Sequence, residues 1–130
     1  RLIYVNILLD THVFIWWNDD PSRLTKKART LIEDKDNTIY VSAVVIWEMM
    51  VKKMLGKLES PDDPLAIAVE QGFIPLPITG EHALMLKTLE PHHNDPFDRL
   101  LIAQAKHEKF TLLTHDKTVM KYAGFDYVKA

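Results

Sequence analysis

Residues 3–10 of the chain are Ile-Tyr-Val-Asn-Ile-Leu-Leu-Asp, a nearly continuous apolar run that ends in an acid. Such a run, of strand length, is typical of a strand in a parallel sheet that is covered on both faces. We therefore predict a buried strand over residues 3–9, with Asp10 at its carboxyl end. In open α/β sheets, ligands bind at this edge.

The rest of the chain continues the alternation of strands and helices. Further strands are predicted over residues 39–41, 73–76, 111–114 and 126–128, and Pro75 favours an edge position for the second of these. Helices are predicted over residues 11–17, 25–34, 42–55, 62–72, 79–88 and 95–107, with a helical turn or two at 117–122. This order predicts an α/β fold with a mostly parallel sheet of about five strands, in a single domain of residues 1–130.

Composition limits the classes of function. The chain has 130 residues, of which 47% are hydrophobic, and it has no cysteine, which excludes disulfide scaffolds, cysteine-ligated zinc and thiol nucleophiles. No apolar stretch approaches the ~20 residues of a membrane-spanning helix, so we expect a cytoplasmic protein with no membrane partner. The net charge of −2 requires that any nucleic acid is bound by a local basic cluster. The candidate clusters, which solvated helix faces explain more readily, are Lys26, Lys27 and Arg29, and Lys52, Lys53 and Lys57.

Two acids follow predicted strands, and two more lie at the start of a predicted helix. Asp10 follows the first strand and Asp116 follows the strand at 111–114, although each acid also suits the N-cap of the next helix. Asp95 fits as an N-cap, with Pro96 as the first helical residue and Asp98 as the acidic member of a capping box. Capping and a ligand role do not exclude each other, because the start of such a helix faces the crevice beyond the strand ends.

Glu48 is a carboxylate in an apolar setting. It lies within the best-marked helix, which Ser42 caps and Gly56 closes, on the same face as Val44 and Val45. A favourable pair between Glu48 and Lys52, four residues on, is the competing interpretation, and it would draw both side chains to the rim.

Four converging carboxylates need a counter-charge, because like charges at close range raise one another's pKa. A divalent cation supplies that charge, and oxygen ligands select a hard ion such as Mg²⁺ or Mn²⁺. Such an ion can activate water for attack on phosphorus and can offset the repulsion between an acidic pocket and a polyanion. The acids therefore point to hydrolysis of phosphodiester bonds.

Four segments of the chain, in order, resemble the motifs of PIN-domain ribonucleases, in particular the toxins of VapBC-type toxin–antitoxin pairs. The first is Leu8-Leu9-Asp10-Thr11-His12, and the second is Trp47-Glu48 with Lys52 and the run Leu-Gly-Lys-Leu at 55–58. The third and most specific is Asp-Pro-Phe-Asp-Arg-Leu-Leu-Ile-Ala-Gln-Ala at 95–105, and the fourth is Leu-Thr-His-Asp at 113–116. The similarity covers nearly the whole chain.

This resemblance implies a three-layer α/β/α fold and an endoribonuclease that uses Mg²⁺ or Mn²⁺ to cut single-stranded or tRNA-like RNA with water. It assigns the metal and catalytic roles to Asp10, Glu48, Asp98 and Asp116, and auxiliary roles to Asp95, Thr11 and Thr114. It also implies a homodimer and a small antitoxin protein that covers an apolar surface. Candidates for that surface, although side chains of this kind at helical spacing are more often plain core, are Trp16, Trp17, Trp47, Met49, Met50 and Met54.

Other interpretations stay open at this point. His12 and His115 adjoin two of the acids, but an oxygen-coordinated ion does not need them as ligands. The chain is also consistent with an RNA-processing or structure-specific nuclease that has no antitoxin. From a different class, a non-catalytic α/β module that binds a protein partner would keep the fold without the activity.

Overall fold

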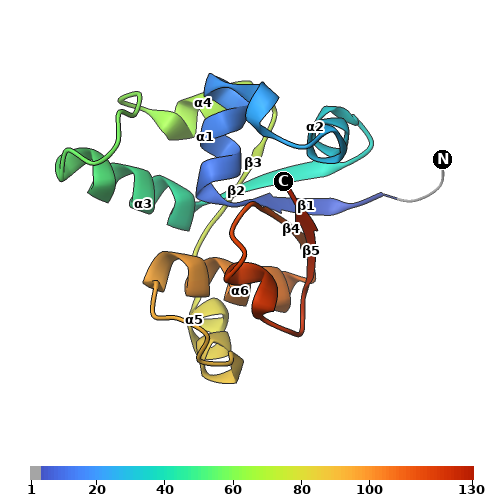
Figure 1. Ribbon diagram of the computed structural model, residues 1–130, viewed down its shortest axis with the longest axis vertical. Helices are drawn as coiled ribbons and strands as arrows, with labels where there is room; N and C mark the ends of the chain where they lie inside the picture. Colours follow the sequence, from blue (N-terminus) through green and yellow to red (C-terminus); the bar gives the residue numbers. More distant parts are fainter. Residues whose placement is uncertain (1–3) are drawn as a thin grey trace.

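The computed structural model describes residues 4–130 and contains a five-stranded sheet in which all neighbouring strands are parallel (Figure 1). The strand order is β3-β2-β1-β4-β5, so the predicted edge position of β3 is confirmed. The strands are β1 (Asn6–Leu9), β2 (Thr38–Ser42), β3 (Ile74–Leu76), β4 (Thr111–Thr114) and β5 (Asp126–Lys129).

The first strand is shorter than predicted. Ile3 lies outside the described residues, and the ladder begins only at Asn6. The reason is visible at Val5, whose N–H donates to the side-chain oxygen of Asn37 at 3.1 Å instead of to a strand partner.

Helices cover both faces of the sheet, which gives the predicted three layers. Figure 1 shows α1, α2 and α4 on one side of the strands and α5 and α6 on the other. The helices are α1 (Thr11–Asp19), α2 (Lys26–Glu33), α3 (Ala43–Met54), α4 (Pro64–Glu70), α5 (Gly80–Met85) and α6 (Pro96–Glu108). Three short 3-10 turns lie at Pro21–Arg23, Leu86–Thr88 and Val119–Lys121.

Three predicted helices are shorter than the sequence suggested. The helix predicted at 62–72 starts only at Pro64, because Asp63 serves as its N-cap. The one predicted at 79–88 ends as an α-helix at Met85 and continues as a 3-10 turn. Between residues 117 and 122 the chain forms a single 3-10 turn.

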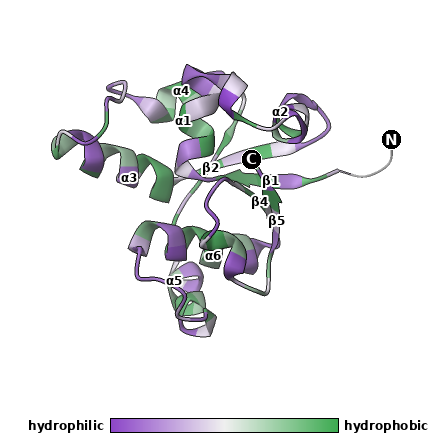
Figure 2. Cartoon of the chain, in the orientation of Figure 1, coloured by the Kyte–Doolittle hydropathy of each residue, from purple (hydrophilic) through white to green (hydrophobic). Residues whose placement is uncertain are grey.

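The core lies on both faces of the two central strands. Ile7, Leu8 and Leu9 of β1 are fully buried, as are Leu112 and Leu113 of β4. Consecutive residues of a strand point to opposite faces, so only a sheet covered on both sides buries every one of them. Figure 2 shows hydrophobic residues on β4 and α6, whereas the loop between α5 and α6 is hydrophilic.

The strand order places a crevice beside β1 and β4. The chain runs from β1 to β2 and β3 on one side, and then returns to form β4 and β5 on the other. Connections therefore leave the carboxyl ends of β1 and β4 in opposite directions, and we call the region beyond these strand ends, where ligands bind in open α/β sheets, the crevice. The two strand ends are held together, because the Asp10 N–H donates to the Leu113 carbonyl at 3.0 Å.

Within residues 4–130, no helix has the length and apolar character that are needed to span a membrane.

Gln104 links α6 to the edge of the sheet through buried hydrogen bonds. Its Oε1 accepts from the Ser42 hydroxyl at 2.5 Å, and its Nε2 donates to the Pro77 carbonyl at 3.2 Å. Ser42 and Gln104 are fully buried, and a buried polar atom that loses its partner costs about 1–3 kcal/mol. The glutamine of the third motif is therefore a structural residue.

Replacing Gln104 with leucine (Gln104→Leu) should lower the free energy of unfolding by about 3 kcal/mol, because the Ser42 hydroxyl and the Pro77 carbonyl lose their partner. Urea unfolding measures the change. The same substitution at the exposed Gln71 (Gln71→Leu) is the matched control and should stay within about 0.5 kcal/mol of the wild type. Equal stability of the two variants would contradict the structural role of Gln104.

Candidate metal centre at the carboxyl edge of the sheet

Asp10 both caps α1 and faces the crevice. Its Oδ1 accepts from the Val13 N–H at 2.9 Å, so the predicted capping role is confirmed. Only 8% of the residue is exposed, and burial raises the pKa of Asp10 despite hydrogen bonds from the Thr114 side chain and from Val13. A buried carboxylate with a raised pKa has a reason to take up a cation.

Glu48 reaches the same region from α3. The hydroxyl of Thr11, the residue after Asp10, donates to Glu48 Oε1 at 2.5 Å. The predicted pair between Glu48 and Lys52 is present, but the prediction that it draws both side chains to the rim is wrong. The Lys52 side chain is 34% exposed and the Glu48 side chain only 5%, because the long lysine stem reaches outward while the carboxylate stays among apolar neighbours.

Asp98 lies in the first turn of α6. Asp95 caps that helix, since its Oδ1 accepts from the Asp98 N–H at 2.9 Å. In a capping box the Asp98 carboxylate would accept from the Asp95 N–H. Here it lies instead next to His93, whose Nε2 is 3.0 Å from Asp98 Oδ2.

The pKa of Asp98 shows which groups surround it. The pKa of Asp98 is raised from 3.8 to about 6, chiefly by burial and also by the charges of Asp95, Asp116 and Glu48, while the hydrogen bond with His93 lowers it. Those three carboxylates lie near enough to interact electrostatically with Asp98, and they come from three other places in the chain: the cap of α6, the segment after β4, and α3. Repulsion between like charges is the physical signature of convergence.

Asp116 is the exposed member of the group. It follows β4 by two residues, and its N–H donates to the Thr114 hydroxyl at 3.1 Å. Its Oδ1 accepts from the Thr118 N–H at 2.7 Å, but the N-cap of the 3-10 turn that follows is Thr118, so the predicted capping role of Asp116 is wrong. Thr114 thus contacts both acids that follow the central strands, because its side chain also hydrogen-bonds to Asp10.

The acids are near one another without being closely clustered. Among residues 4–130, three or more ligand atoms of acids or histidines lie within 4.8 Å of one another only at His82, His107 and Glu108. Among any three of the four crevice acids, at least one pair of ligand atoms is therefore more than 4.8 Å apart. The donor set is nevertheless carboxylate and hydroxyl oxygen, which suits a hard divalent cation, and such an ion would also relieve the repulsion at Asp98.

The cluster of His82, His107 and Glu108 does not have the protonation of a metal site. The Thr79 N–H donates to His82 Nδ1 at 3.0 Å, so that nitrogen carries a lone pair. The proton of the neutral ring must then lie on Nε2, which is 2.7 Å from Glu108 Oε2 and donates to it. Binding a metal through Nε2 would require a ring without any proton, so we assign His82 to the structure that joins α5 to α6.

His93, in the loop before α6, is the neighbour of the acids that sequence reasoning missed. Its Nδ1 lies 2.9 Å from the Tyr122 hydroxyl, which also accepts from Arg99 Nη1 at 2.8 Å. His93 is thereby held between Tyr122 and Asp98. No local pattern predicts this, because Tyr122 reaches the loop only through the folding of the segment after β4.

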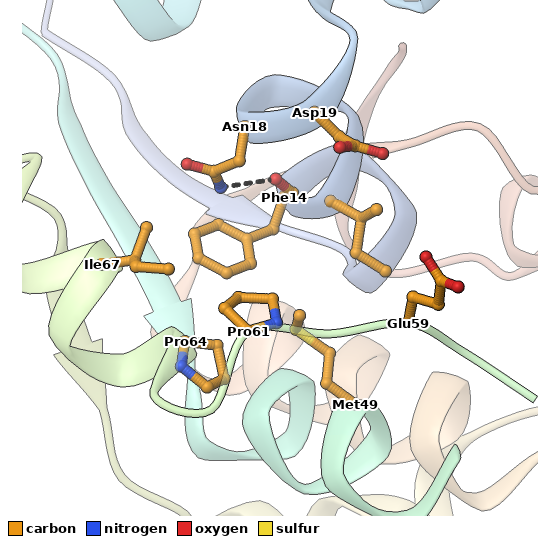
Figure 3. Close-up of a pocket in the computed structure, with 9 residues that line it drawn as sticks. Phe14, Asn18, Asp19, Met49, Glu59, Pro61, Pro64 and Ile67 are labelled. Atoms are coloured by element: carbon orange, nitrogen blue, oxygen red, sulfur yellow. Dashed lines mark hydrogen bonds between the residues drawn. The ribbon is translucent and has the colours of Figure 1, made fainter. Parts of the chain in front are cut away.

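A hollow lined by apolar and polar side chains lies between α1, α3 and the segment that leads into α4 (Figure 3). Its volume is about 380 Å³, and the residues that line it are Phe14, Ile15, Asn18, Asp19, Met49, Glu59, Pro61, Pro64 and Ile67. Of the side chains considered as a partner surface, Trp16 and Met49 are buried core, whereas Trp47 and Met54 are exposed. The candidate surface is therefore divided between core and exterior.

Stability without metal should depend on pH through Asp98. The pKa of Asp98 is raised from 3.8 to about 6, so the folded chain binds this proton more tightly than the unfolded chain does. The penalty for the ionised acid is therefore present above about pH 6 and disappears as the pH falls toward about pH 4. In the presence of a chelator, lowering the pH from about 7 to about 5 should therefore stabilise the wild type relative to an Asp98→Asn variant. Parallel stability curves of the two proteins in urea unfolding would contradict the raised pKa.

These observations define the class of the protein: an α/β protein with four carboxylates near the switch point of a parallel sheet. The chain belongs to the PIN domain family, whose model matches residues 7–125. All four crevice acids lie in the matched region.

Individual relatives agree with this family. The chain is 29% identical over 126 residues to Ribonuclease VapC22 of Mycobacterium tuberculosis, a match that covers 89% of this chain and 91% of the relative. Among solved structures, VapBC2 from Rickettsia felis bound to a promoter DNA fragment has a similar chain, with a TM-score of 0.73, 16% identity and coverage of 95% and 98%. DNA-bound VapBC from Salmonella typhimurium gives a TM-score of 0.70, 13% identity and coverage of 95% and 97%. At these identities the two structures support the fold.

Proposed function

We propose that this chain is a metal-dependent endoribonuclease and the toxin of a toxin–antitoxin pair. The observation that carries the proposal is that Asp98 interacts electrostatically with Asp95, Asp116 and Glu48 at the edge of the sheet where Asp10 follows β1. A relative that covers nearly the whole chain is named a ribonuclease, which favours RNA as the substrate class.

Asp10, Glu48, Asp98 and Asp116 would hold the cation. Their ligand atoms are oxygens, which favours Mg²⁺ or Mn²⁺ over zinc. When bound, such an ion lowers the pKa of a water molecule and stabilises charge on the leaving oxygen of a phosphodiester.

The neighbouring side chains orient these acids. Thr11 donates a hydrogen bond to Glu48, and the Thr114 side chain contacts Asp10. Asp95 holds the Asp98 N–H, and His93 holds the Asp98 carboxylate. Groups that fix the ligands of a metal in this way typically change metal affinity or activity by about 10–100-fold when they are removed.

A small antitoxin protein is the proposed partner. The solved relatives from Rickettsia felis and Salmonella typhimurium are VapBC complexes, and this chain has a hollow with apolar walls at Phe14, Met49 and Ile67 between α1 and the segment that leads into α4. An apolar segment of the antitoxin would bury that hollow, and a basic side chain would neutralise the crevice acids. The homodimer implied by the resemblance stays a prediction.

The test is cleavage by the partner-free chain of single-stranded and tRNA-like RNA, with DNA of the same sequence alongside. We expect RNA to be cut with Mg²⁺ or Mn²⁺, DNA to remain intact, and cleavage to stop when a chelator is added. Because water attacks phosphorus, the products should lack 2′,3′-cyclic phosphates, and a single 2′-deoxy sugar at the cut should not prevent cleavage.

Two outcomes would contradict the proposal. Cyclic phosphate ends would mean that the 2′-hydroxyl is the nucleophile, which does not need the crevice acids. Intact RNA in both metals, together with tight binding of a protein partner, would favour the non-catalytic module.

A further inference from the structure

A second hollow lies beside the acidic crevice and is lined by cationic and apolar side chains. Its volume is about 260 Å³. We call it the lysine hollow, and its lining residues are Thr11, His12, Ile15, Lys52, Lys57 and Leu58. The first three belong to α1, Lys52 to the end of α3, and the last two to the segment that follows.

The turn after α3 brings the two lysines to the same hollow. Gly56 has a φ of +71°, a left-handed conformation that glycine adopts without strain. The Lys57 N–H then donates to the Lys52 carbonyl at 2.8 Å, and the Gly56 N–H to the Lys53 carbonyl at 3.0 Å. These two bonds form the Schellman motif, which turns the chain back over the last turn of the helix.

The lysine hollow shares two residues with the neighbourhood of the acids. Thr11 donates a hydrogen bond to Glu48, and Lys52 forms an ion pair with the same carboxylate. Lys52 also interacts electrostatically with Asp95 and Asp98. A ligand group bound in the lysine hollow would therefore lie next to a ligand group bound by the crevice acids.

Lys57 supplies positive charge that is not already neutralised. No carboxylate of residues 4–130 forms an ion pair with Lys57, whereas Lys53, on the same helix end, pairs with Asp62 at 2.7 Å. A chain with a net charge of −2 needs local cations to receive a polyanion. Lysine binds phosphate as a point charge, and the apolar side chains of Ile15 and Leu58 suit a sugar.

We propose that the lysine hollow binds a backbone phosphate of the RNA, one that neighbours the phosphate to be cut. This proposal rests on the proposed nuclease function and adds to it a site that positions the strand. Lys57 provides the main charge, and Lys52 connects this phosphate site to Glu48. Contacts of this kind fix the register of a nucleic acid without reading its sequence.

The experiment measures binding of a short fluorescent single-stranded RNA to the Asp98→Asn chain, which should not cut it. Lys57→Gln is compared with Lys53→Gln, which removes the same charge from a lysine outside the hollow. Both lysines are at the surface, and thermal unfolding checks that both variants are folded. A series of RNAs, each with one backbone phosphate replaced by a neutral methylphosphonate, locates the contact along the strand.

We expect Lys57→Gln to weaken binding about fivefold and to lower the slope of log affinity against log salt by about 0.7, the value for one phosphate contact on a single strand. Lys53→Gln should change neither quantity. One methylphosphonate position should weaken RNA binding to the Asp98→Asn chain that keeps Lys57, but not to the same chain with Lys57→Gln. In the cutting enzyme, Lys57→Gln should raise KM with little change in kcat.

Several results would overturn the proposal. Equal losses in Lys57→Gln and Lys53→Gln would indicate general charge rather than a site. Normal RNA binding by Lys57→Gln, with weakened binding of an antitoxin instead, would assign the hollow to a protein partner. These two outcomes would not contradict the proposed nuclease function. That function would be contradicted if the Asp98→Asn chain, with Lys53 and Lys57 both present, bound no RNA at all.

Discussion

Replacing Asp98 with asparagine (Asp98→Asn) is expected to lower the rate of metal-dependent RNA cleavage roughly a thousandfold, which corresponds to about 4 kcal/mol in the barrier. Asparagine keeps the shape of the side chain, and its oxygen can still accept from His93. It lacks the negative charge that interacts with Glu48, Asp95 and Asp116. The crevice therefore loses one of its cation ligands and binds the cation more weakly. Initial rates at saturating Mn²⁺, together with calorimetric titration of Mn²⁺ without RNA, measure the two effects.

Asp126→Asn is the matched control, because it removes one exposed carboxylate from the start of β5. This residue lies at the amino end of its strand, whereas the crevice lies beyond the carboxyl ends. Both its cleavage rate and its Mn²⁺ affinity should equal those of the wild type. The metal-free Asp98→Asn protein should be more stable than the wild type at neutral pH, because a partly buried charge is removed. Wild-type cleavage by Asp98→Asn would remove this acid from the proposed site.

The sequence predicts the elements that present the acids better than it predicts their neighbours. Asp10 and Asp116 follow apolar runs, so their places at strand ends are readable from the chain alone. That both runs become central, paired strands is a property of the strand order, which no local pattern contains. For Glu48 the sequence left two interpretations open, and the side chain both pairs with Lys52 and stays buried.

The contacts around the acids could not be predicted, because they join segments far apart in the chain. His93 meets Tyr122 across 29 positions, and Ser42 meets Gln104 across 62. The Gln104 side chain lies in the most recognisable motif, yet its role is to hold α6 against the sheet. A motif therefore marks a region of the fold, and only the geometry separates its ligand residues from its structural ones.

Asp10 allows the capping and ligand roles of one side chain to be separated. Asparagine is as good an N-cap as aspartate, so Asp10→Asn should keep the bond from the Val13 N–H and therefore the stability of α1. Asp10→Ala should lose that bond and about 1 kcal/mol of unfolding free energy relative to Asp10→Asn. Both variants should nevertheless lose Mn²⁺ affinity and RNA cleavage to a similar extent, because each lacks the carboxylate.

Urea unfolding in chelator and cleavage assays in Mn²⁺, done on the same two proteins, give the comparison. Since burial raises the pKa of Asp10, the asparagine variant should be at least as stable as the wild type when no metal is present. If Asp10→Asn cut RNA at the wild-type rate and only Asp10→Ala were impaired, Asp10 would be a cap alone, and the crevice would have to work with three acids. If both variants are inactive while only the alanine variant is less stable, one carboxylate at the end of β1 both starts a helix and serves the metal centre.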